Sequence, residues 1–215
     1  MRIIAAIATI LSLLPLLNHP ARAQEERPAT TLITNINIFD GVNNRLMPGN
    51  VLIENNLIKA VGFNVKAPGG ATVIDGGGRT LMPGMIDSHV HFNMIIEGGL
   101  KEIESSRWDR IATVAAASAQ EWLLDGFTTV RGMGGMGNGM KMTIDEGLLD
   151  GPRIYPSGSY ISQTSGHGDL LLGSQRDPQK SNMVQLRITQ IADGPFAVRA
   201  AVRKNFAAGA SQRVP

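Results

Sequence analysis

The chain has 215 residues, of which 43% are hydrophobic and 18% are charged, proportions that are typical of a folded globular protein and not of a disordered or fibrous one. Its formal net charge is +2, and only 5% of its residues are aromatic. The chain therefore has few aromatic side chains on which nucleic-acid bases could stack. It contains no cysteine, so any metal site must use histidine, carboxylate or modified lysine side chains.

Residues 1–23 have the pattern of a secretory leader. Arg2 precedes an apolar stretch from Ile3 to Leu17, and Ala21-Arg22-Ala23 offers the small residues that a signal peptidase needs before Gln24. The apolar stretch is shorter than the ~20 residues of a membrane anchor, so we expect cleavage after Ala23 and a secreted, periplasmic protein. Cleavage removes two arginines and leaves 18 basic and 18 acidic residues, which gives no reason to expect nucleic-acid or membrane partners.

A polar linker, residues 24–30, precedes a region with the pattern of short β-strands. Apolar and polar residues alternate over 32–38, the period of a half-buried strand. Residues 51–58 predict a hairpin with its turn at Glu54-Asn55-Asn56, and residues 71–74 predict a further strand. We therefore expect residues 31–82 to form a small antiparallel β unit.

After Pro83-Gly84 the pattern changes to alternating strands and helices. Such alternation predicts parallel strands in an α/β fold. In chain order we expect a strand over 85–92, a helix from about 107 to 124 capped by Ser105 or Ser106, a strand over 127–130, a brief helix over 143–149, a strand beginning over 153–156, a long loop, and a helix from Asp193-Gly194-Pro195 to about Ala208.

Two histidines lie in the first of these expected parallel strands. Because side chains alternate between the faces of a strand, His89 and His91 should project to one side and Val90 to the other. Neighbouring imidazoles on one face can hold a common metal ion at about 2.0–2.1 Å. The spacing alone is equally compatible with two unrelated histidines, one of them a hydrogen-bonded core residue.

The residues around the histidines resemble a known family. Leu81–Phe92, LMPGMIDSHVHF, is similar to the first-strand signature of the amidohydrolase superfamily, in which Pro-Gly, a hydrophobic pair and Asp precede His-x-His. Residues 31–82 resemble its N-terminal β-sandwich segment, residues 126–131 its second barrel strand, and residues 151–158 with 163–169 its imidazolonepropionase-like and prolidase-like branch. The resemblance covers essentially all of the chain after the leader.

This resemblance implies an α/β fold in which residues 83–215 form a partial TIM (β/α)8 barrel, about the first three βα units, after a β-sandwich segment. It also implies a metal-dependent hydrolase that cleaves C–N bonds of an amide, dipeptide-like or cyclic-amide substrate with metal-activated water. His89 and His91 would hold one of one or two divalent ions, with zinc expected. Asp87 would either orient these histidines without binding the metal itself or form a hydrogen bond at the end of the strand. His167 would either contact the substrate or be a surface loop histidine.

The same resemblance implies that the chain is an N-terminal piece. Only 124 residues (215 minus 91) follow His91, whereas a complete barrel takes about 250. A bridging lysine, two further histidines and the expected catalytic aspartate would therefore be missing, and Arg213 near the expected fourth strand cannot replace such a lysine because its guanidinium stays protonated. We expect an inactive truncated enzyme; the alternative is a non-catalytic exported fragment or binding protein.

Two other patterns carry less weight. Gly132–Gly137 formally matches the G-x-G-x-x-G of dinucleotide sites, but methionines interrupt it and we expect no clear strand–helix pair around it. The basic residues Arg199, Arg203 and Lys204 are expected to form a solvated helix face.

Overall fold

The structure is a computed structural model that describes residues 29–94, 97–169 and 181–211. It divides into two compact units, Met1–Leu81 and Met82–Pro215. The expected leader, nearly all of the linker, and Arg213 lie outside the described residues. Among the described residues, no helix combines the length and the apolarity needed to cross a bilayer.

The first unit is a five-stranded sheet in the order β3-β2-β1-β4, with β5 also paired to β1. Its strands are β1 Thr30–Ile38, β2 Met47–Glu54, β3 Leu57–Gly62, β4 Thr72–Asp75 and β5 Thr80–Leu81. The predicted hairpin is confirmed, because β2 and β3 pair antiparallel across a turn in which Asn55 takes a positive φ of 55°, a conformation that asparagine tolerates. A small core of Ile36, Ile38 and Val51 holds the sheet together.

The expectation of a purely antiparallel unit is wrong. Both β4 and β5 pair in parallel with β1, because the connection from Phe63 to Ala71 is long enough to carry the chain back before the next strand begins. All five strands belong to one sheet, and the part of this unit that the structure describes contains no second sheet facing it.

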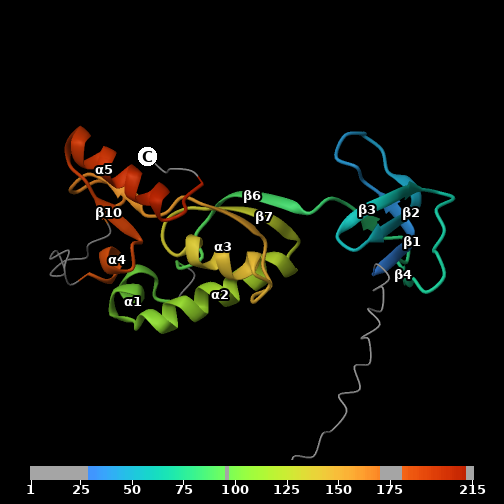
Figure 1. Cartoon of the computed structure of the whole chain (residues 1–215), viewed down its shortest axis with the longest axis horizontal. Helices are drawn as coiled ribbons and strands as arrows, with labels where there is room; N and C mark the ends of the chain where they lie inside the picture. Colours follow the sequence, from blue (N-terminus) through green and yellow to red (C-terminus); the bar gives the residue numbers. More distant parts are fainter. Residues whose placement is uncertain (1–28, 95–96, 170–180, 212–215) are drawn as a thin grey trace, which may run out of the picture. The chain divides into compact units, whose positions relative to one another are not determined.

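The second unit is built on three parallel strands in the order β6-β7-β8, of which Figure 1 labels β6 and β7. These are β6 Met85–Val90, β7 Phe127–Gly132 and β8 Arg153–Pro156, joined through the helices α2 Trp108–Leu124 and α3 Gly137–Asp145. One face of the sheet meets both helices in a core to which each element contributes apolar side chains. That core consists of Val90, Phe92, Ala115, Ala119, Val130, Met140 and Ile154.

Five further elements complete the described part of the second unit. They are α1 Gly99–Ser105, β9 Tyr160–Ser162, α4 Asn182–Gln185, β10 Thr189–Ile191 and α5 Gly194–Ala207. Strands β9 and β10 pair in parallel with each other, and a second core of Ile103, Ile111, Met183 and Ile188 joins α1, α2 and α4. The α/β fold is confirmed, and the described strands form open sheets.

Two helix predictions need correction at their N-termini. Arg107 is the N-cap of α2, because the Ser105 hydroxyl bonds back to the carbonyls of Lys101 and Glu102 in the preceding, unforeseen helix α1. The helix expected over 143–149 instead runs from Gly137 to Asp145. Its glycines are poor helix formers, but Gly137 lies against Pro156, where a side chain would crowd the ring, so packing determines the start.

Helix α5 begins at the expected Gly194, and its side chains Val198 and Phe206 are 39% and 51% exposed. The buried residues are Ala201 and Asn205, because the Asn205 side chain bonds both backbone groups of Ser159, accepting from its N–H and donating to its carbonyl.

Candidate metal-binding site

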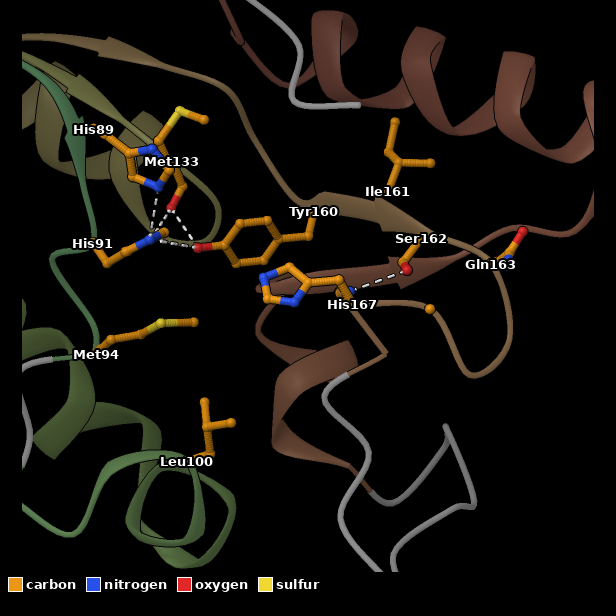
Figure 2. Close-up of a pocket in the computed structure, with 12 residues that line it drawn as sticks. His89, His91, Met94, Leu100, Met133, Tyr160, Ile161, Ser162, Gln163 and His167 are labelled. Atoms are coloured by element: carbon orange, nitrogen blue, oxygen red, sulfur yellow. Dashed lines mark hydrogen bonds between the residues drawn. The ribbon is translucent and has the colours of Figure 1, made fainter.

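Strand β6 places its two histidines as the alternation predicts. Val90 is buried in the core beside α2 and α3, whereas His89 and His91 face the other way and bring their Nε2 atoms within 3.1 Å of each other (Figure 2). Their rings meet edge to face, with centroids 4.9 Å apart. The prediction that both histidine side chains project from the same face is therefore confirmed.

A backbone carbonyl fixes the far side of the His91 ring. The Nδ1 atom of His91 lies 2.8 Å from the carbonyl oxygen of Met133, just after β7. A carbonyl only accepts hydrogen bonds, so Nδ1 carries the proton and the Nε2 lone pair is directed toward His89. Metal-binding histidines usually donate their second nitrogen to a carbonyl or carboxylate in this way.

Tyr160, at the start of β9, completes this arrangement. Its hydroxyl donates to the Met133 carbonyl at 3.0 Å and also contacts Nδ1 of His91. Burial raises the pKa of the Tyr160 phenol to about 12, so the hydroxyl keeps its proton at neutral pH. Neither group was predicted from the sequence. Met133 acts through its backbone and gives no side-chain signal, whereas Tyr160, one of two tyrosines, could have been noticed as a lone aromatic residue among small polar ones.

Asp87 lies beside the histidines without joining them. Its carboxylate accepts the backbone N–H of His89 at 2.8 Å and therefore holds the strand end from which both imidazoles project. This is the strand-end hydrogen bond anticipated for Asp87.

The histidine pair opens into a cavity of about 580 Å³ that His167 also lines. Figure 2 shows Tyr160 between His91 and the loop that carries His167. That loop is tied down at two points, since the Ser162 hydroxyl accepts the Gly168 N–H and the Asp193 carboxylate accepts two bonds from Thr164. The other lining side chains near the histidines are mainly apolar: Met94, Leu100, Met133 and Ile161.

The histidine pair fits one edge of a zinc site. Two nitrogen ligands at about 2.0–2.1 Å in tetrahedral geometry lie about 3.3 Å apart, close to the 3.1 Å between the Nε2 atoms. Within the described ranges, no cluster of three histidine, aspartate or glutamate side chains could enclose an ion. The described residues therefore offer two candidate ligands for an ion, fewer than a closed site requires.

Comparison with known proteins places this site in a family. Residues 80–214 match the Amidohydrolase family. An ochratoxinase from Aspergillus niger is 34% identical over 146 residues, which cover 60% of this chain and 29% of that protein. A 5-methylthioadenosine/S-adenosylhomocysteine deaminase from Pyrococcus furiosus is 38% identical over 71 residues, covering 33% of this chain and 17% of the deaminase.

Solved structures agree. A crystal structure of an amidohydrolase aligns with a TM-score of 0.76 at 35% identity, and a prolidase complexed with N-methylphosphonate-L-proline aligns with a TM-score of 0.76 at 31% identity. Each alignment covers 86% of this chain and 46% of the solved chain. The chain thus spans less than half the length of these relatives. From the family match and these structural neighbours, the chain belongs to the amidohydrolase family, in its prolidase-like branch.

Proposed function

We propose that this chain forms part of the active site of a metal-dependent hydrolase that cleaves C–N bonds in small amide-like or dipeptide-like substrates, with His89 and His91 binding one divalent ion, zinc by expectation. The observation that carries the proposal is the 3.1 Å approach of the two Nε2 atoms at the wall of a cavity. Family membership supports it, since amidohydrolases are generally metal-dependent.

Each residue of the site has a part in this proposal. A bound ion supplies an acidified water and a polarised substrate oxygen. His89 and His91 hold the ion, Asp87 holds the backbone of His89, and His167 donates a hydrogen bond to a substrate oxygen or carboxylate from the opposite part of the cavity. The apolar side chains between them favour a substrate with an apolar group beside the bond that is cleaved.

The same proposal gives the second unit its architecture. Strands β6, β7 and β8 are the first three strands of a (β/α)8 barrel, with the histidines and the Met133 carbonyl at the carboxyl ends of the first two. Active sites in that fold lie at this end of the strands.

The exported, periplasmic location proposed from residues 1–23 is tested by N-terminal sequencing of the secreted protein, which should begin at Gln24.

Metal titration tests the proposal directly. Cobalt(II) added to the purified chain should give one weakly bound ion per molecule with a visible absorption band, and zinc should displace it. His89→Ala and His91→Ala should each abolish the band, whereas His167→Ala, which removes the other histidine of the cavity, should leave it. A band of equal strength in the His91→Ala variant would refute the proposal.

Turnover provides a second test. Acyl-proline dipeptides and cyclic amides are the substrates to assay with added zinc, and any hydrolysis by this chain should disappear in the His89→Ala variant. Hydrolysis that persists without His89 would assign the activity to another group.

A further inference from the structure

We propose that Tyr160 is a positioning residue for His91, and that Gly134 is the residue that allows it to act. Its hydroxyl holds the Met133 carbonyl against Nδ1 of His91, and so keeps the imidazole in the tautomer whose Nε2 lone pair faces His89. This deepens the proposed function, and rests on it only where metal affinity is the readout.

The hydrogen-bond acceptors determine where the protons lie among His91, Met133 and Tyr160. The Met133 oxygen lies 2.8 Å from His91 Nδ1 and 3.0 Å from the Tyr160 hydroxyl. Because the carbonyl has no proton to give, both neighbours donate to it, and its two lone pairs accommodate both bonds. Nδ1 of His91 is then protonated, so the phenol oxygen of Tyr160 is the acceptor in its contact with Nδ1, and Nε2 remains as the acceptor or metal-binding atom.

Gly134 makes room for the tyrosine ring. It has φ of +73°, and a Cβ built there would fall 2.3 Å from the Tyr160 ring. Any other residue would therefore push the ring away from His91 as well as strain the backbone. The loop is also tied on both sides, because the Gly134 N–H donates to the buried Ser157 hydroxyl at 2.8 Å and the Met133 N–H donates to the Val90 carbonyl at 2.8 Å.

The backbone of Tyr160 is fixed from the opposite direction. Its N–H donates to the Ile188 carbonyl at 2.9 Å, and the preceding Ser159 is bonded through both backbone groups to the buried Asn205 side chain. The hydroxyl thus reaches His91 from an anchored strand. Three segments converge on one imidazole: the end of β6, the glycine-containing loop after β7 and the start of β9.

The tautomer of His91 can be measured without any metal. Long-range proton–nitrogen NMR of the metal-free protein should show His91 protonated at Nδ1 in the wild type, and a mixture of tautomers in Tyr160→Phe, which keeps the ring and removes the hydroxyl. Tyr155→Phe removes the only other tyrosine hydroxyl and should leave the tautomer unchanged. A wild-type His91 protonated at Nε2, or an unchanged tautomer in folded Tyr160→Phe, overturns the proposal.

Metal affinity is the second readout. Tyr160→Phe and Gly134→Ala should each weaken cobalt(II) binding by about 10- to 100-fold, the usual effect of losing a group that orients a ligand, while Tyr155→Phe should bind like the wild type. If the wild type binds no metal but the tautomer changes as expected, the metal proposal fails and the positioning role stands. If metal binds and Tyr160→Phe changes neither readout, the positioning role fails alone.

Discussion

The two units of the chain bury their apolar residues to very different extents. In the first unit the largest buried cluster has three residues, and strand side chains such as Leu57 and Val73 are 68% and 58% exposed. In the second unit, residues such as Ile111 and Ile154 are 0% and 1% exposed and belong to two cores. The first sheet is thus stabilised by a small buried cluster, whereas the second unit, where the candidate site lies, is stabilised by two cores of fully buried side chains.

The largest expected effect separates the two units by stability. Ile154→Ala removes a fully buried side chain from the core of β6–β8 and should destabilise the second unit by about 2–5 kcal/mol. Both tryptophans, Trp108 and Trp122, lie in α2, so denaturation followed by tryptophan fluorescence reports on this unit. The control Ile58→Ala, at a side chain 70% exposed in β3, should leave that transition unchanged. Equal shifts of the unfolding transition in Ile154→Ala and Ile58→Ala would contradict the difference in burial between the two units.

An intermediate effect is expected at Asn182, which links α1 to α4. Its side-chain amide lies 2.8–3.1 Å from the carbonyl oxygens of Ile103, Glu104 and Ser106, groups at the end of a helix that need donors. Asn182→Ala should cost about 1–3 kcal/mol, because partly buried carbonyls lose their partner. Hydrogen exchange should show faster opening of α1 with little change in β7. A uniform change across the unit would contradict this local role.

The smallest effect is a pH dependence at the loop that carries His167. The Thr164 hydroxyl and N–H donate to Asp193 at 2.6 and 2.9 Å, and these bonds hold the pKa of the Asp193 carboxyl below its usual value. A lowered pKa means that the contribution is complete above the unfolded value of about 3.9 and is lost as the pH falls through the lower folded value.

The amide of Thr164, followed by NMR, should therefore remain hydrogen-bonded down to pH values below about 3.9 and then be released. In Asp193→Asn the same amide should show no such transition, since an amide side chain does not titrate in this range. Release at the same pH in both proteins would assign the transition to another group.

Much of the fold could be predicted from local pattern. Alternation predicted β1, and the asparagine turn predicted the β2–β3 hairpin. The expected helix end near residue 124 and the Asp193-Gly194-Pro195 start match the end of α2 and the beginning of α5. Short elements such as α4 and β10 were missed, because a strand of three residues or a single helical turn leaves no period to detect.

The common face of His89 and His91 could be predicted from the sequence, whereas the backbone group beside them could not. The two-residue spacing of His89 and His91 is enough to place both imidazoles on one face. The Met133 carbonyl could not be foreseen, because it depends on how the glycine run Gly132–Gly137 turns between β7 and α3. That run was expected to lack a flanking strand–helix pair; it has one, and it contributes a carbonyl and space for a tyrosine ring.

X-ray absorption spectroscopy of the zinc-loaded chain tests the central claim most directly, since it counts the imidazoles bound to the metal. We expect two histidine nitrogens at about 2.0–2.1 Å from the metal, and the loss of this imidazole signal in His89→Ala and in His91→Ala. A spectrum without imidazole scattering, or one that neither substitution changes, would show that the two histidines do not bind a common ion.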